Sequence, residues 1–125
     1  MKTTERVLEF LRTQGFCPET DENNSIIFKY QMVTFIYINN DEDEDFFQLA
    51  LPFIQEVTDD NRDIVLEALN QTNSGVKVAK TSIIDNSVWA FFEIFLDSTP
   101  EVKDIIPRAL NCLMVTRQTF YENIG

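Results

Sequence analysis

The sequence predicts an α+β domain in the order α-β-β-β-α-β-β-α, with a five-stranded antiparallel sheet and helices mainly on one of its faces. Five runs rich in Phe, Ile, Val and Tyr are typical of strands, and the links between neighbouring runs are too short for parallel crossovers. Three other segments carry apolar residues at helical spacing, enough to cover one sheet face. The chain of 125 residues, 1–125, is expected to form a single domain around one core.

The first half of the chain holds one helix and three strands. Thr3 or Thr4 can cap a helix that runs to about Gln14, and Gly15 stands where a left-handed residue often ends a helix. After a loop at 16–24, strands are expected at Ile26–Tyr30, Met32–Asn39 and Phe46–Phe53. The first two strands leave almost no room for a turn, so this hairpin must be tight.

The second half holds a helix, a hairpin and a last helix. Thr58–Asp60 supply an N-cap and negative charge for a helix that runs to about Asn73 and ends at Gly75. Asp85-Asn86, a pair that tolerates positive φ, is expected to join two strands. Those strands are expected at Val76–Ile84 and Ser87–Asp97.

The last helix is the clearest helical signal in the chain. Thr99 is expected to cap it, Pro100 to take its first position, and Glu101 to add negative charge to its first turn. Apolar residues then recur at helical spacing as far as Tyr121. Pro107 lies inside this pattern, so a kink or a restart of the helix is expected there.

The strand Ser87–Asp97 has two apolar faces, and this is unusual for a sheet with one wet side. One face holds only apolar residues: Val88, Ala90, Phe92, Ile94 and Leu96. The other face holds three aromatics and two carboxylates: Trp89, Phe91, Glu93, Phe95 and Asp97. A strand with one face in water normally alternates apolar and polar residues. Something is therefore expected to cover part of the second face.

The strand at 32–39 repeats this two-sided pattern, with Val33, Phe35 and Tyr37 opposite Met32, Thr34, Ile36 and Ile38. Several aromatics exposed together exceed the apolar patch that a monomer tolerates. The candidate interface residues are therefore Trp89, Phe91, Phe95, Phe35 and Tyr37. Three explanations stay open: burial within one chain, a homodimer through the sheet, or a groove for a client peptide or small apolar ligand.

Composition excludes several classes of function. The formal charge of −11, with 10 Lys plus Arg against 21 Asp plus Glu, argues against nucleic acid and anionic membranes as partners. No apolar segment has the length of a signal peptide or approaches about 18 residues, so a cytoplasmic protein is expected.

Nothing in the sequence predicts an enzyme, a cofactor or a metal. The chain has no histidine, so Ser-His, Cys-His and His-metal schemes are excluded, and Cys17 and Cys112 have no histidine to activate them. Only three glycines are present, and no phosphate-binding loop can be found. Glu93 and Asp97, four residues apart on a strand, would lie roughly 13 Å apart, beyond the carboxylate separation of glycosidases.

The element order resembles the type III secretion chaperone-like fold and, within it, the YbjN-type family of small bacterial proteins. The resemblance lies in four stretches: ERVLEFLRTQGF, IIFKYQMVTFIYIN, FFQLALPF after an acidic linker, and ALNQTNSGVKVAK. It implies a non-enzymatic, chaperone-like or regulatory protein, because secretion chaperones of this fold are homodimers that bind extended segments of their effectors. The preferred reading is a homodimeric protein-binding module; the alternative is a small-ligand binder whose pocket wall is the aromatic sheet face.

The acidic run Asp41–Asp45 suggests a calcium site, because dense carboxylates are calcium ligands, but it lacks the central glycine and the terminal glutamate of an EF-hand loop. Five adjacent carboxylates on a hairpin loop usually form a solvated, mutually repelling tip. We therefore expect millimolar calcium to leave the melting temperature unchanged in differential scanning fluorimetry, with magnesium as the control cation. A rise of several degrees with calcium alone would contradict this.

Overall fold

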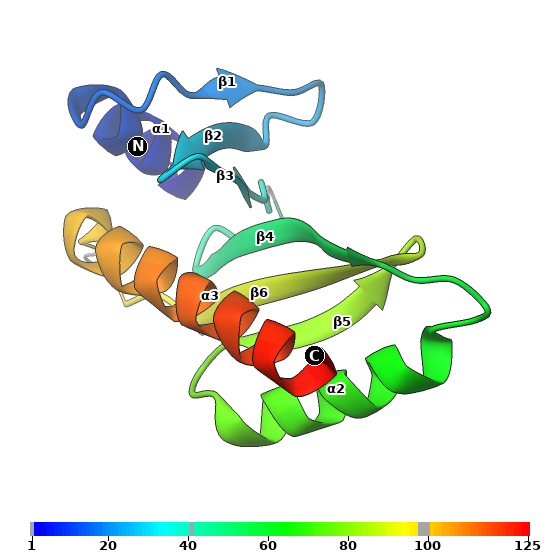
Figure 1. Ribbon diagram of the computed structural model, residues 1–125. Helices are drawn as coiled ribbons and strands as arrows, with labels where there is room; N and C mark the ends of the chain where they lie inside the picture. The colour runs from blue at the N-terminus through cyan, green and yellow to red at the C-terminus, as the bar shows by residue number, and fades with distance from the viewer. Residues whose placement is uncertain (1, 41, 98–100) are drawn as a thin grey trace.

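The structure is a computed structural model that describes residues 2–40, 42–97 and 101–125 (Figure 1). Its element order is α-β-β-β-β-α-β-β-α, with one strand more than the sequence predicts. The elements are α1 (Thr3–Thr13), β1 (Glu19–Thr20), β2 (Ile26–Tyr30), β3 (Val33–Tyr37), β4 (Phe46–Glu56), α2 (Arg62–Gly75), β5 (Lys80–Ile84), β6 (Ser87–Phe95) and α3 (Val102–Ile124).

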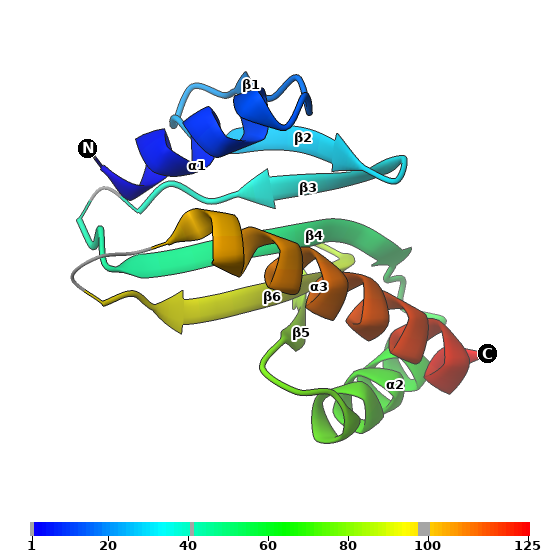
Figure 2. The same cartoon turned by 90° about the vertical axis from the view of Figure 1, so that its left-hand side faces the viewer.

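All six strands form one antiparallel sheet in the order β1-β2-β3-β4-β6-β5. The three helices lie on the same side of this sheet, with α1 over β2 and β3 and α3 along β4 and β6 (Figure 2). The predicted α+β class and the one-sided helical layer are therefore confirmed. The count of five strands is wrong, because the two-residue β1 lies in the expected loop and shows no periodic signal.

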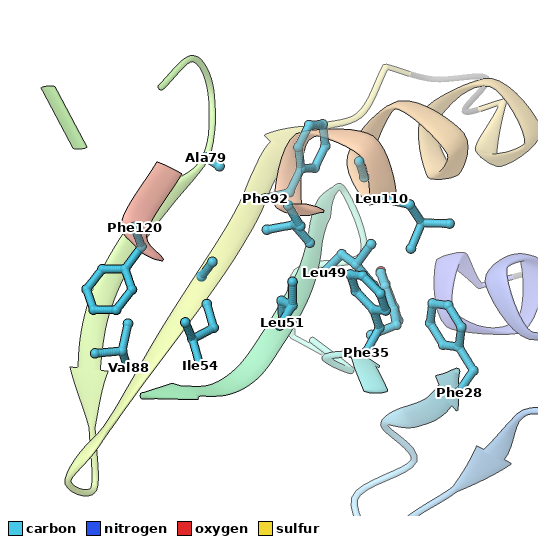
Figure 3. Packing of buried hydrophobic residues seen from close by; sticks show 14 of the residues in the cluster. Phe28, Phe35, Leu49, Leu51, Ile54, Ala79, Val88, Phe92, Leu110 and Phe120 are labelled. Atoms are coloured by element: carbon cyan, nitrogen blue, oxygen red, sulfur yellow. The ribbon is translucent and has the colours of Figure 1, made fainter. Parts of the chain in front are cut away.

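A single core lies between the helices and one sheet face (Figure 3). On β6 this face carries Val88, Ala90 and Phe92, as the alternation predicts, and each of them is buried. All three helices contribute to the same core, with Leu11 from α1, Val65 from α2 and a longer stripe from α3. The stripe on α3 consists of Ile106, Ala109, Leu110, Leu113 and Phe120. None of the helices in the described residues covers the other sheet face.

The start of α1 differs from the prediction and its end agrees with it. Neither threonine caps the helix: Thr3 donates a hydrogen bond to the Glu44 carbonyl at 2.6 Å, and Thr4 donates to the side chain of Asn39 at 2.7 Å. Both hydroxyls therefore tie α1 to the connection between β3 and β4. Gly15 is left-handed at φ 80° and, with Phe16, donates backbone hydrogen bonds to the last turn of the helix.

The β2–β3 and β5–β6 hairpins close with two-residue turns in which each central residue has positive φ. Asp85 and Asn86, at 47° and 63°, form the predicted turn between β5 and β6. Gln31 and Met32, at 51° and 66°, close the β2–β3 hairpin, so β3 begins at Val33 and Met32 is 94% exposed. The tight first hairpin is thus confirmed, with Met32 moved from the strand into the turn.

The last helix runs unbroken through Pro107, so a restart there does not occur. The proline is exposed and lies near the helix N-terminus, and the buried apolar stripe that follows it holds the helix against the sheet. The predicted cap and first position, Thr99 and Pro100, lie outside the described residues. The second helix begins at Arg62, a little after the expected start, and ends at Gly75.

Strand β5 begins at Lys80 and not at Val76 as the sequence suggests. Val78 has φ 71°, which turns the chain away from the sheet before the strand starts. The outer edge of β5 is then closed by α2: the Asn73 side chain accepts a hydrogen bond from the Thr81 N–H at 2.8 Å and donates one to the Thr81 carbonyl at 3.2 Å. Helix α2 thus protects this edge from pairing with another strand.

Replacing Asn73 with alanine is expected to lower the free energy of unfolding by about 2 kcal/mol, because the N–H and carbonyl of the buried Thr81 lose their partners. Urea unfolding followed by far-ultraviolet circular dichroism measures this loss. Asn70→Ala, one turn earlier on α2, is the matched control and is expected to change stability by less than about 0.5 kcal/mol. Equal losses in both variants would show that the side chain does not hold the edge.

Candidate interaction surface

The helix-free side of the sheet is the candidate surface, and we call it the open face. Directly paired residues of neighbouring strands share a face. The register therefore places one row of side chains across five strands: Ile27, Ile36, Ala50, Phe91 and Lys80. Three aromatic residues of β6, Trp89, Phe91 and Phe95, also lie on this face, as the alternation predicts.

Aromatic side chains gather in two groups on the open face. In the first group the Trp89 ring stacks on Phe91 with centroids 6.0 Å apart and meets the edge of Phe53 at 5.3 Å. In the second group Phe46 and Phe95 pair across β4 and β6 at 5.5 Å. Phe53 and Phe95 are 72% and 76% exposed, whereas Phe91 is nearly covered by its neighbours. The open face is therefore apolar at two places and unprotected there.

A polar group separates the two aromatic groups. The Glu93 carboxylate accepts a hydrogen bond from the Gln48 side chain at 2.6 Å and forms an ion pair with the Lys80 ammonium at 2.6 Å. The Glu93 side chain is 20% exposed, so the pair is partly sheltered from water. With Lys29 the open face carries two lysines, against three glutamates, because Glu19 pairs with Ile27 and Glu56 with Ser87 on the same face as Glu93. Most of the charge of −11 is therefore located elsewhere.

Phe35 and Tyr37 do not belong to this surface, and their prediction as interface residues is wrong. They are 0% and 1% exposed and pack in the core beneath the helices, with the Phe35 ring stacked on Phe28 at 5.8 Å. Both faces of β3 are apolar, so alternation alone cannot say which set meets the helices. The larger aromatic set fills the core, and Ile36 lies on the open face.

Phe53 is the surface residue that the sequence pattern misses. Strict alternation along β4 places it with Leu49 and Leu51 on the core side. The pairing of β4 with β6 is interrupted between Leu51 and Gln55, and Phe53 itself has φ 57°. This bulge turns Phe53 to the other side, beside Trp89. Pro52, which cannot donate a ladder hydrogen bond, is the sequence signal for such a bulge.

The remaining candidates add no chemistry to this surface. Within residues 2–40, 42–97 and 101–125, no three His, Cys, Asp or Glu side chains gather as a metal site would require. Cys17 is exposed, Cys112 is half-buried, and neither forms a disulfide. No helix in the described part of the chain has the length and apolarity needed to cross a membrane.

Solved structures of other proteins share this fold. No protein-family model and no curated protein matches the sequence. The structure of YbjN from E. coli, a protein put forward as a transcription regulator, superposes with a TM-score of 0.70 at 9% identity, over 90% of this chain and 86% of that one. An uncharacterised protein from Methanothermobacter thermautotrophicus superposes with a TM-score of 0.62 at 17% identity, over 98% and 99%.

These similarities show the fold alone. They support the YbjN-like architecture that the sequence suggests, and the link to secretion chaperones stays a prediction. At these identities no functional residue can be transferred to this chain.

The location of Tyr37 in the core has a measurable consequence, because its hydroxyl is buried. Desolvation raises the pKa of Tyr37 from 10.0 to about 12, and a hydrogen bond with the Thr4 side chain offsets part of that rise. The unfolded chain therefore loses this proton at lower pH than the folded chain. Stability is unaffected below pH 10 and falls as the pH rises from 10 through 12.

Between pH 8 and pH 11, the wild type is expected to lose about 1.4 kcal/mol more stability than Tyr37→Phe, which lacks the titrating hydroxyl. Urea unfolding of both proteins at the two pH values isolates the contribution of Tyr37 to the free energy of unfolding, because all other groups that titrate at alkaline pH are present in both proteins. Parallel losses would mean that the Tyr37 hydroxyl is solvated in the folded protein.

Proposed function

We propose that this protein is a non-enzymatic protein-binding module that acts as a homodimer through the open face of its sheet. The observation that carries the proposal is the pair of exposed aromatic groups around Trp89 and Phe95 on a face without helices. Aromatic residues in an apolar patch are the usual energetic centre of protein interfaces.

Charge favours a second copy of the chain as the occupant of this face. Two chains of −11 repel each other at long range, so a self-interface must avoid the acidic surface. The open face largely does so, because Lys29 and Lys80 offset two of its three glutamates, Glu19, Glu56 and Glu93. Two such faces can pack as the layers of a β-sandwich do, with side chains interdigitated between sheets.

Regulation through a protein partner fits the proposed binding module better than regulation through direct binding to DNA. The E. coli structure with the same fold belongs to a protein put forward as a transcription regulator. In this chain the excess of 21 acidic over 10 basic residues opposes phosphate binding. We therefore infer that any regulation by this protein works through binding another protein.

The small-ligand alternative has less support. A hollow of about 730 Å³, within the size range of ligand pockets, is lined by α3, β6 and Val78. Its lining contains none of Trp89, Phe91 or Phe53.

Phe53→Asp tests the homodimer. It places a charge in the first aromatic group and is expected to weaken dimerisation about a hundredfold, the loss typical of an interface hot spot. Light scattering and sedimentation over a concentration series measure the effect. Because Phe53 is 72% exposed in the single chain, the variant is expected to stay folded.

Two companion variants complete the test. Ile64→Asp, at a 59% exposed position on α2, is the matched control and is expected to leave the dimer intact. Trp89→Asp is expected to give a folded monomer. A wild type that is monomeric at all concentrations, or a Phe53→Asp protein that dimerises as the wild type does, would refute the homodimer.

A further inference from the structure

Strand β6 has an unpaired edge along its second half. It pairs with β4 along its length, from Ser87 to Phe95, whereas its pairing with β5 ends at Phe91 opposite Lys80. Nothing in the described part of the chain pairs with the far side of β6 beyond that point. The outer edge of β5, on the same side of the sheet, is closed by the Asn73 side chain. The fold therefore closes one edge and leaves the neighbouring one open.

The backbone groups at the open edge can be assigned from the ladder. The Leu96 N–H bonds to the Asp45 carbonyl at 2.6 Å, so even-numbered residues of β6 direct their N–H and C=O groups toward β4. Odd-numbered residues direct theirs the other way. The peptide groups of Glu93 and Phe95 therefore point outward at the edge, ready to pair with an added strand.

The edge is open because β5 turns away from it. If β5 continued in register toward Val76, Val78 would lie opposite Glu93 and Val76 opposite Phe95, by extension of the Lys80–Phe91 pairing. Instead Val78 has φ 71°, a conformation that a β-branched residue adopts only under strain. Such strain is often found at binding sites.

The edge borders the hollow of about 730 Å³ described above, which we call the β6 groove. Phe92 and Ile94 of β6 form one wall of the groove, Ile105 and Cys112 of α3 the other, and the 62% exposed Val78 lies at one end. Figure 3 shows Phe92 projecting from β6 toward α3. An added strand would place every second side chain among these apolar groups.

The alternate side chains of an added strand would meet carboxylates. Those opposite Glu93 and Phe95 fall on the open-face side, beside Glu93, which is already paired with Lys80, and Asp97 lies just beyond the strand. Asp97, Glu101 and Asp104 line the hollow that adjoins the groove, and Arg108 is the one cation among the residues that line either. This charge favours lysine or arginine on the incoming strand and disfavours another copy of this acidic chain.

From these observations we infer that the β6 edge binds an extended segment of another protein, in which apolar residues alternate with lysine or arginine. The apolar residues enter the groove beside Phe92 and Ile94. The segment adds antiparallel to β6, as every other strand pair of this sheet is. Its basic residues then pair through their backbones with Glu93 and Phe95 and direct their side chains toward the carboxylates. This site uses the backbone edge of β6 and the β6 groove, whereas the proposed dimer uses side chains of the open face. The two adjoin at Glu93 and Phe95, and the inference stands without the dimer.

A fluorescein-labelled peptide of alternating lysine and valine, seven residues long, is the probe, and fluorescence anisotropy measures its binding to the full chain. N-methylation of the lysine backbones removes the N–H groups that would face β6, and is expected to weaken binding at least about tenfold. N-methylation of the valine backbones leaves charge and composition the same but faces solvent, and is expected to change binding less than about threefold. Equal effects of the two peptides would overturn strand addition.

The matched protein variants are Phe95→Pro and Phe95→Ala. Both remove the exposed ring, but only proline removes the outward N–H, and its ring blocks the edge without touching the bonds to β4. Phe95→Ala is expected to bind the peptide within about threefold of wild type, and Phe95→Pro at least about tenfold more weakly. Circular dichroism checks that both variants are folded. Equal binding by the two would overturn the site.

Three further outcomes are decisive. Phe53→Asp is expected to keep peptide binding while it loses the dimer, so failure of one proposal does not decide the other. The amide protons of Glu93 and Phe95 are expected to exchange fast in the free protein and slowly with peptide; slow exchange without peptide would show that the edge is already paired. Loss of the dimer in Phe95→Pro but not in Phe95→Ala would assign the edge to a second copy, against our inference.

Discussion

The structure depends on the packing of three helices against one face of one sheet. Residues from α1, α2 and α3 contribute to the same core, which contains Phe47, Leu49 and Phe92. A chain of 125 residues can build only one such core. The other face is therefore left to solvent, and its aromatic residues must be stabilised by one another or by a second molecule. The functional questions about this protein follow from that one-sided arrangement.

Much of this arrangement is readable from the sequence, because alternation reports which residues share a face. It separates Val88, Ala90 and Phe92 from Trp89 and Phe91, and the structure keeps the two sets apart. Alternation does not report which face the helices take when both are apolar, as on β3. That choice depends on the volume of the whole core. Alternation alone therefore does not show that Phe35 and Tyr37 face the helices. The register of β3 with β4 settles it, by pairing Ile36 with Ala50.

Two of the features that the sequence pattern misses break the regular period of a strand. The bulge in β4 reverses Phe53, and the left-handed Val78 delays the start of β5 to Lys80, four residues after the predicted start at Val76. Each places a large apolar side chain in solvent, at 72% and 62% exposure. Local propensity favours neither, because non-glycine residues rarely adopt positive φ. Departures from local preference are expected where function imposes its own requirement, and these two lie at the two proposed binding sites.

The polar centre of the open face bears on how tightly two copies would associate. Closing a dimer over the Glu93–Lys80 pair would remove two charges from water, and the desolvation cost of such a pair often equals or exceeds its Coulomb attraction. The hydrogen bond from Gln48 lowers that cost by satisfying a second carboxylate oxygen. A wholly apolar face would bind more tightly but would accept many relative orientations of two sheets. An ion pair between two aromatic groups instead penalises every register that leaves it unpaired, so the association is expected to be reversible and of a single geometry.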